Sequence, residues 1–162
     1  MVHRDRDFMT DAEVAMWRDL YRTEGVFAWV CAHGDVESYF CEADNLVALY
    51  GVPREVAEAW RAEAAAGIEG ARKTFFEKRK VVNRTLWPDG GSPNSDDLWR
   101  DGGDESPRKR VGKGLWKALK PIVKAAGYDD KRLNSFTIPK GWEMARDLKA
   151  TLEQALAAPK PG

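Results

Sequence analysis

Two aspartates stand one residue apart near the start of the sequence, Asp5 and Asp7 in the stretch HRDRDFM. Residues i and i+2 of a β-strand point to the same side, so two carboxylates with this spacing at a strand end face one point. Hard divalent cations such as Mg²⁺ or Mn²⁺ prefer oxygen ligands, and open α/β sheets place their sites at the carboxyl ends of strands. The pair is therefore a candidate metal site, and a solvated, charged tail is the alternative interpretation.

A second pair of acids with the same spacing follows the apolar run VFAWVC at 26–31, which is typical of a buried strand. Asp35 and Glu37 lie directly after it, in the stretch HGDVESYF. Parallel strands end at a common edge of the sheet, so this turn is expected beside the first pair of acids. Glu37 is a candidate further metal ligand, and an exposed turn with ordinary acids is the alternative.

A lysine, Lys113, stands at the start of an expected helix in the stretch GKGLW. At a helix N-terminus it is placed to reach a phosphate, and a surface lysine in a basic stretch is the alternative. A second basic run covers 72–84, although charge runs on helices are often only solvated faces. The basic residues near Lys113 form a candidate nucleic-acid surface. They are Arg108, Lys109, Arg110, Lys117 and Lys120.

The spacing of apolar residues predicts mostly helices, with few and short strands. The first helix carries a capping box, Thr10 and Glu13, and each later helix is bounded by glycine or proline. The expected helices cover 10–25, 42–50, 53–86 with a break near Gly67 and Gly70, 113–126 and 140–156. A short extended piece is expected over 132–139.

Residues 1–31 are expected to form a strand end, a helix and a strand, which is the second half of a βαβ unit with a parallel sheet. The fold class is therefore α/β, helix-rich, with a small parallel sheet whose first strand or strands are expected to be missing from this chain. The expected organisation is a core over 1–87, a loop over 88–110 whose composition also fits disorder, a helical part of the same domain over 111–157, and a tail over 158–162.

Composition sets the outer limits on function. Lys plus Arg and Asp plus Glu both number 26, so a nucleic-acid surface has to be a local patch. There is no apolar run long enough for a transmembrane helix and no signal-peptide pattern. Cys31 and Cys41 do not suggest a disulfide scaffold, and reduced, buried thiols favour a cytoplasmic location.

These stretches in this order resemble the C-terminal part of a topoisomerase–primase (Toprim) domain. The closest type is that of the overcoming-lysogenization-defect (OLD) family of ATPase-linked defence nucleases. The resemblance covers roughly residues 2–156 and is carried by HRDRDFMTDAEV, GDVESYF and, more weakly, GKGLWKAL. It implies that Asp5 and Asp7 are the paired metal-binding aspartates, that Glu37 is a further ligand, and that Lys113 stabilises charge on the scissile phosphate.

The function that this resemblance implies is hydrolysis of phosphodiester bonds with Mg²⁺ or Mn²⁺, in DNA or in RNA, as part of antiviral defence. The family's first strand and its glutamate do not stand before Met1, nor does a Walker motif occur. The implied partners are therefore an ATPase domain or subunit, or a polypeptide that completes the sheet, with a homo-oligomer also open. Two alternatives remain: a non-catalytic interaction module that keeps a Toprim remnant, and a helical nucleic-acid-binding protein.

Overall fold

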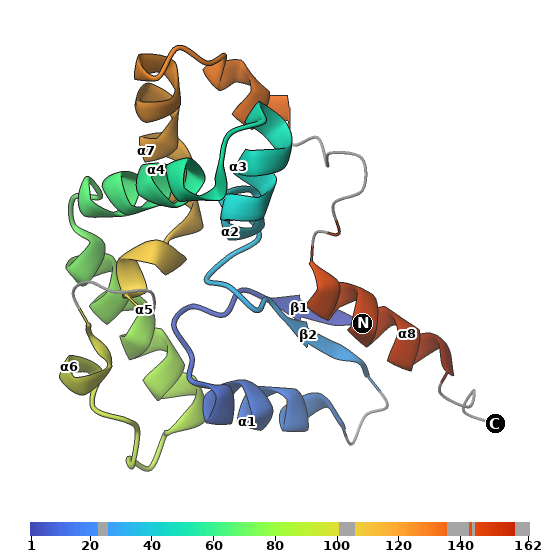
Figure 1. Ribbon diagram of the computed structural model, residues 1–162. Helices are drawn as coiled ribbons and strands as arrows, with labels where there is room; N and C mark the ends of the chain where they lie inside the picture. Colours follow the sequence, from blue (N-terminus) through green and yellow to red (C-terminus); the bar gives the residue numbers. More distant parts are fainter. Residues whose placement is uncertain (23–25, 101–105, 136–142, 144, 158–162) are drawn as a thin grey trace.

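The computed structural model describes residues 1–22, 26–100, 106–135, 143 and 145–157. These residues form a helix-rich α/β structure with one small sheet (Figure 1). The elements are β1 (Val2–Arg4), α1 (Asp11–Arg22), β2 (Ala28–Val30), α2 (Glu37–Phe40), α3 (Ala43–Tyr50), α4 (Arg54–Ala66), α5 (Ala71–Leu86), α6 (Ser95–Leu98), the 3₁₀ turn η1 (Pro107–Arg110), α7 (Gly112–Ala125), η2 (Asp130–Ser135) and α8 (Arg146–Ala157).

The two strands pair in parallel, as the strand–helix–strand pattern predicted. His3 pairs with Trp29, and Arg4 pairs with Val30. The ladder continues one step beyond the strands, because the Cys31 amide donates to the carbonyl of Arg4 over 3.2 Å. The acids that follow each strand therefore start from the same edge of the sheet.

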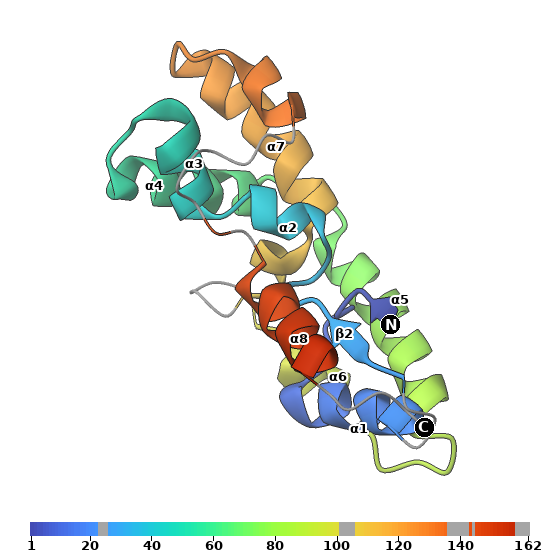
Figure 2. The same cartoon turned by 90° about the vertical axis from the view of Figure 1, so that its right-hand side faces the viewer.

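Helices cover both faces of this sheet. Val30, with Val2 and Ala28 beside it, packs on Trp17 of α1 and Val82 of α5. On the opposite face Trp29 and Cys31 pack with Tyr39, Ala145 and Leu148, so α8 covers that side (Figure 2). Both strands consequently lie between two layers of helix, as an α/β architecture requires.

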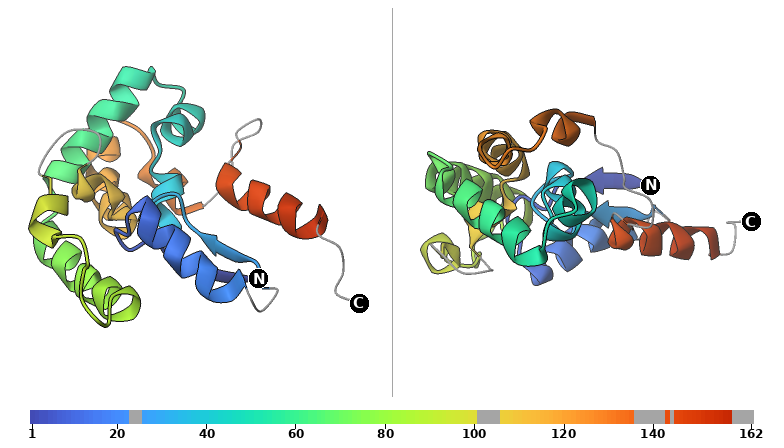
Figure 3. Two further views of the ribbon diagram at one scale, coloured as in Figure 1. Left: turned by 90° about the horizontal axis from the view of Figure 1, so that it is seen from below. Right: turned by 45° about the horizontal axis from the view of Figure 1, so that its top comes forward.

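A second core lies away from the sheet, in a lobe that consists of α3, α4, α7 and η2. Its buried residues come from two distant stretches of the chain, with Leu46 and Trp60 on one side and Leu115, Leu119 and Leu133 on the other. The 3.6-residue spacing of these side chains gives each helix one apolar face. In both views of Figure 3, α8 (red) projects on one side of the molecule, apart from α4 (green).

The capping box at the start of α1 forms as predicted. The Thr10 amide donates to the Glu13 carboxylate over 2.8 Å, and the Glu13 amide donates back to the Thr10 hydroxyl over 3.2 Å. Glu13 is also completely buried, and Arg79 of α5 donates to both of its oxygens over 2.6 and 2.8 Å. Arg79 is therefore not part of the exposed basic face that was predicted over 72–84. It is buried and holds α1 against α5.

The described residues of 88–110, a range expected to be a loop, are turns and irregular chain apart from two short helical elements. Asn94 accepts a hydrogen bond from the Asp96 amide over 2.8 Å and starts the short helix α6. Further on, Ser106 caps the 3₁₀ turn η1 and Pro107 takes its first position. Local capping by side chains gives this polar stretch structure, and 101–105 lie outside the described residues.

Three other boundaries differ from the expectation. Residues 132–135 belong to the 3₁₀ turn η2 and are not extended, while 136–139 lie outside the described residues. The last helix begins at Arg146, because Ala145 has a left-handed backbone with φ 53°. The turn after β2 contains one helical turn, α2. None of the helices in the described part of the chain combines the length and the apolar character that crossing a bilayer requires.

The buried pair between Glu13 and Arg79 gives the first prediction. Arg79→Met leaves the Glu13 carboxylate buried without its cation, so we expect a loss of about 3–5 kcal/mol in the free energy of unfolding, measured with urea. Arg72→Met on the same helix breaks an exposed ion pair with Asp96 and a contact of the guanidinium with the Phe76 ring, and we expect it to cost about 1 kcal/mol. Equal costs for the two variants would contradict a special role for the buried pair.

Candidate functional site

Acids and bases from four parts of the chain line one pocket at the carboxyl ends of the strands. We call it the acid–base pocket. Its volume is about 180 Å³, and Phe8, Gly34, Thr74 and Val111 complete its wall. Three acids and three bases line it: Asp5, Asp7, Asp35, Lys78, Arg110 and Lys113. The structure thus brings Asp5 and Asp7 together with Lys113, which stands more than a hundred positions away in the sequence.

The two aspartates reach the pocket from a tight turn and not from a strand. β1 ends at Arg4, and Asp7 and Phe8 have left-handed backbones with φ 46° and 64°. The expectation that strand alternation points both carboxylates to one side is therefore wrong. The Asp7 amide donates to the Gly34 carbonyl over 3.2 Å, and Arg79 donates to the Phe8 carbonyl over 3.3 Å. Strained residues held by such contacts are typical of functional sites.

Lys78 of α5 contacts the turn that carries Asp7. Its ammonium lies 2.8 Å from the Asp7 carboxylate, which raises the pKa of Lys78 above its usual range. In the sequence this lysine stands only within the basic run at 72–84. Lys78 lines the pocket because its neighbour Arg79 is buried. The buried guanidinium fixes the rotation of α5 about its axis. No short-range pattern in the sequence indicates this contact.

Asp35 joins the turn after β2 to the start of α7. One carboxylate oxygen accepts from the Ser38 amide over 3.0 Å and from the Ser38 hydroxyl over 2.7 Å, and the other accepts from the Lys113 amide over 3.3 Å. Two glycines allow this approach. A Cβ on Gly112 would lie 1.8 Å from the Asp35 carboxylate, and a Cβ on Gly34 would lie 1.7 Å from the Arg110 carbonyl oxygen.

Glu37 and Lys113 form an ion pair at the edge of the pocket, with 3.6 Å between ammonium and carboxylate. Lys113 lines the pocket and Glu37 does not. The acids still act on one another: burial, followed by the charges of Asp7 and Asp35 and to a smaller degree Glu37, raises the pKa of Asp5. The predicted residues therefore share one electrostatic environment, in which a cation would relieve the repulsion.

A compact group of potential metal-ligand atoms lies at residues other than the predicted set of Asp5, Asp7 and Glu37. Among the residues that the structure describes, one group of three potential ligands has all its ligand atoms within 4.8 Å of one another: His3, Asp5 and Cys31. Among the described residues, the predicted set of Asp5, Asp7 and Glu37 does not form such a group, and Lys78 pairs with Asp7 while Lys113 pairs with Glu37. No local sequence pattern indicates that His3 and Cys31 meet, because their closeness depends on the strand register.

The predicted nucleic-acid residues do not gather around the pocket. Of the five, Arg110 alone lines it. Arg108 donates to the Ile68 carbonyl over 3.2 Å, and Lys109 follows it in η1. On α7, Lys117 is exposed, and the Lys120 ammonium lies 3.4 Å from the centre of the Trp116 ring. A nucleic-acid surface through all five stays a prediction.

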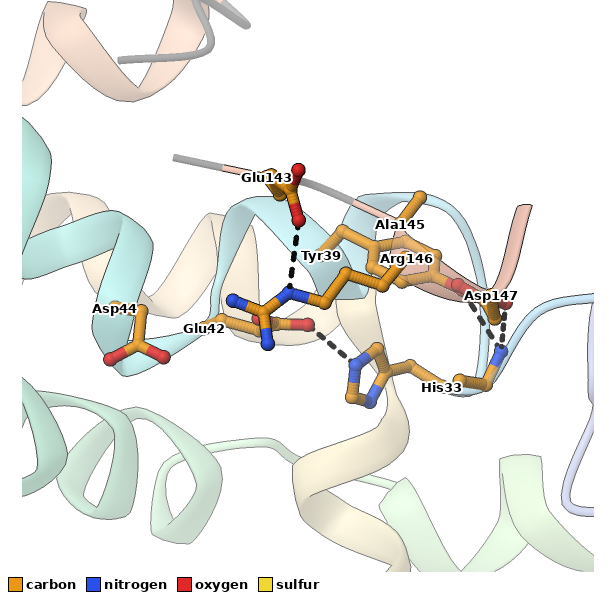
Figure 4. Close-up of a pocket in the computed structure, with 9 residues that line it drawn as sticks. His33, Tyr39, Glu42, Asp44, Glu143, Ala145, Arg146 and Asp147 are labelled. Carbon is orange, nitrogen blue, oxygen red and sulfur yellow. Dashed lines mark hydrogen bonds and ion pairs between the residues drawn. The ribbon is translucent and has the colours of Figure 1, made fainter. Parts of the chain in front are cut away.

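A second cavity, of about 350 Å³, lies between the β2–α2 turn and the start of α8 (Figure 4). His33 and Glu42 form an ion pair of 2.5 Å on its wall. At its inner end Asp147 accepts from the Tyr39 hydroxyl over 2.7 Å, from the Trp29 indole over 2.8 Å and from the Ala32 amide over 3.0 Å. Burial on its own would raise the pKa of Asp147, but these hydrogen bonds outweigh it and lower the pKa.

Comparisons with known protein families, with curated proteins and with solved structures found no match to this chain. The resemblance to Toprim domains therefore rests on the quoted residues alone.

The close approach at Gly112 gives the second prediction. Gly112→Ala sets a methyl group against the Asp35 carboxylate and the Ser38 amide, at 1.8 and 2.4 Å, so we expect a loss of at least about 2 kcal/mol in unfolding free energy. Gly67→Ala is the control, because its Cβ meets only ordinary contacts at 3.6 Å. We expect the control to be neutral or slightly stabilising. A tolerated Gly112→Ala would show that α7 does not approach the turn this closely.

The third prediction concerns Asp147 and pH. Asp147→Ala removes three hydrogen bonds to a charged acceptor, so we expect a loss of about 2–4 kcal/mol at pH 7. Because the folded pKa of Asp147 lies below the ordinary value of 3.8, the wild-type advantage is complete above that pH and shrinks as the pH falls through the folded pKa.

Urea unfolding of the wild type and of Asp147→Ala at pH 7 and pH 3 measures this change. Asp44→Ala is the matched control, since Asp44 lines the same cavity and makes only an exposed ion pair with Arg54. We expect the control to differ from the wild type by about 0–1 kcal/mol. A cost for Asp147→Ala that stays the same at both pH values would contradict the assignment.

Proposed function

We propose that the acid–base pocket hydrolyses phosphodiester bonds in a nucleic acid with the help of a divalent cation. The observation that supports this is the meeting of Asp5, Asp7 and Asp35 with Lys113 in one pocket at the ends of two parallel strands. Carboxylates suit Mg²⁺ or Mn²⁺, and basic side chains suit the phosphate that such an ion holds. The pocket holds Asp5, Asp7 and Lys113, to which the resemblance to Toprim nucleases assigns roles, and Glu37 lies at its edge.

The carboxylates fit a cation on physical grounds. Asp5 lies near three other acids and is partly buried, which raises its pKa. Such a cluster is costly without positive charge, and a divalent ion would remove that cost. Asp5 and Asp7 would hold the ion, with Asp35 and Glu37 near them. A divalent ion, when bound, supplies charge neutralisation and an activated water.

The basic side chains would bind and orient the substrate. Lys113 is 71% exposed at its side chain, so it can leave Glu37 and approach a phosphate oxygen. It follows the first residue of α7, where the helix dipole adds positive potential. Arg110 lies on the same wall of the pocket. Preorganised positive groups of this kind stabilise the charge that develops on the phosphate during hydrolysis.

The setting that we propose for this activity follows the same resemblance. The substrate is DNA, or RNA as the alternative, and the process is antiviral defence. An ATPase domain or subunit, a polypeptide that adds strands to the sheet, or a second copy of the chain would act with it. Both cysteines are free and buried, which fits the reducing cytoplasm that we propose as its location.

The fourth prediction is the direct test of this function. Purified chain with Mg²⁺ or Mn²⁺ should nick supercoiled plasmid, and Asp5→Ala/Asp7→Ala should reduce the rate by at least about 100-fold, because the ion loses its ligands. Lys113→Ala should reduce the rate by about 10- to 100-fold through loss of charge stabilisation. The measurement is gel analysis of plasmid topology over time.

Matched variants control for charge and folding. Asp19→Ala/Asp89→Ala removes the same number of exposed carboxylates away from the pocket, and Lys124→Ala removes an exposed lysine at the far end of α7. Both should keep the wild-type rate. Nicking that survives in Asp5→Ala/Asp7→Ala, or that needs no metal, would overturn the proposal. A folded chain that does not nick alone leaves the partner-dependent form, which is tested by adding the candidate ATPase subunit.

A second function, a non-catalytic interaction module, is favoured by one specific observation. The acids already have partners within the chain: Lys78 for Asp7, Lys113 for Glu37, and hydrogen bonds from Ser38 for Asp35. These three acids thus have partners within the chain without an ion. Absence of metal-dependent nicking, with or without a partner, would favour this second function.

A further inference from the structure

We propose that His3, Asp5 and Cys31 form a binding site for a transition-metal ion of the zinc class. This site differs in its ligands from the acid–base pocket, although Asp5 belongs to both. The inference does not rest on the proposed hydrolysis, because it concerns which ion the residues bind. Its basis is the register of the sheet, the spacing of the ligand atoms and the surroundings of the imidazole.

The register of the two strands places the three side chains on one face of the sheet. His3 pairs with Trp29 across the ladder. The Cys31 amide donates to the Arg4 carbonyl, so Asp5 and Cys31 follow the paired strands side by side. Side chains at i and i+2 share a face, and Cys31 packs on the face that α8 covers. Strand alternation, which does not hold for Asp7, therefore places His3 and Asp5 on the same face of the sheet.

The spacing of the three ligand atoms is close to that around a tetrahedral ion. The His3 Nε2 atom lies 3.2 Å from the Cys31 Sγ atom and 3.7 Å from the Asp5 Oδ1 atom. The Cys31 Sγ atom lies 3.9 Å from the same Asp5 oxygen. Bonds of about 2.0 Å to nitrogen and oxygen and about 2.3 Å to sulfur place tetrahedral ligands about 3.3–3.6 Å apart. Shifts of about 0.4 Å would therefore suffice to seat the ion.

The direction of the imidazole argues for a metal site over a cysteine–histidine–acid catalytic triad. In a triad the acid contacts the ring nitrogen that faces away from the nucleophile. Here the same nitrogen of His3 faces both Cys31 and Asp5, so the three groups converge on one point. Cys31 is also 1% exposed, so its thiol is not open to attack a substrate.

The ligand types define the class of ion. A thiolate and an imidazole select zinc-class transition metals over Mg²⁺ or Ca²⁺, which prefer oxygen alone. Three protein ligands leave one position for water or a substrate oxygen, as in catalytic zinc sites. His3 lies at the exposed side and Cys31 at the buried side, so the free position faces outward.

The surroundings hold the imidazole in place. The His3 ring stacks on the Trp29 ring with 4.5 Å between centroids and an angle of 27° between planes. The Trp29 indole in turn donates to Asp147 over 2.8 Å, so α8 orients the stacking partner. Contacts that orient a ligating histidine are a usual part of metal sites.

The fifth prediction is a titration of the purified chain, without a polyhistidine tag, with Co²⁺ alone. We expect one equivalent to bind, a thiolate-to-cobalt charge-transfer band in the near ultraviolet, and loss of the band on addition of Zn²⁺. Cys31→Ser should abolish the charge-transfer band. His3→Ala should weaken Co²⁺ binding by more than about 100-fold, because losing a ligand exceeds the effect of losing a ligand's supporting contact.

Cys41→Ser is the matched control, since Cys41 is equally buried and belongs to no candidate ligand group among the described residues. It should keep the band. Far-UV circular dichroism checks that each variant folds. Absence of a band in the folded wild type, or a band that survives in Cys31→Ser, would overturn the inference. The titration measures Co²⁺ binding, so its outcome does not depend on whether the chain nicks plasmid.

Discussion

The buried ion pair between Glu13 and Arg79 holds the first part of the structure together. Glu13 begins α1 through its capping box, and its carboxylate also accepts from Arg79 on α5 and from the Trp87 indole over 3.0 Å. A buried carboxylate is tolerated only when its oxygens are satisfied in this way. Burial by itself would raise the pKa of Glu13, and these hydrogen bonds lower it. The pair therefore keeps α1 and α5 in one fixed arrangement against the sheet.

The same pair shapes the acid–base pocket. Arg79 donates to the Phe8 carbonyl and so supports the left-handed turn that carries Asp7. Lys78, the neighbour of Arg79, then meets Asp7. On the other wall, Gly34 and Gly112 let η1 and α7 approach the turn after β2 closely enough for Asp35 to accept from the Lys113 amide. One wall of the pocket therefore depends on the buried charge of Arg79. The other wall depends on Gly34 and Gly112, which have no side chain.

Asp5 is the point at which two kinds of metal chemistry meet in these proposals. Toward the pocket it lies among acids and lysines, a setting for a hard ion and a phosphate. Toward the sheet it lies beside His3 and Cys31, a setting for a softer ion. Asp5 lines the acid–base pocket, so a zinc-class ion held by Asp5 would lie beside that pocket. The two proposed sites therefore share Asp5. Which ion binds there would depend on which neighbours of Asp5 act as ligands.

Much of the fold could be predicted from short-range pattern. The capping box of α1, the parallel pairing of β1 and β2, the end of α3 at left-handed Gly51 and the division between α4 and α5 all follow from local residue types, because capping and apolar spacing act within a few positions. Polar composition predicted a loop over 88–110, and side-chain caps at Asn94 and Ser106 form short helical turns within it that composition does not show.

The sequence by itself determined which residues are candidates for the acids and the lysine of the pocket, because carboxylates and amines are chemically identifiable wherever they stand. Only the tertiary structure decided which of them meet. Asp35 and Lys78 enter the pocket, Glu37 stays at its edge, and His3 and Cys31 come within reach of Asp5. These contacts depend on strand register, on the rotation of α5 about its axis and on glycine contacts between distant segments, none of which a local pattern encodes.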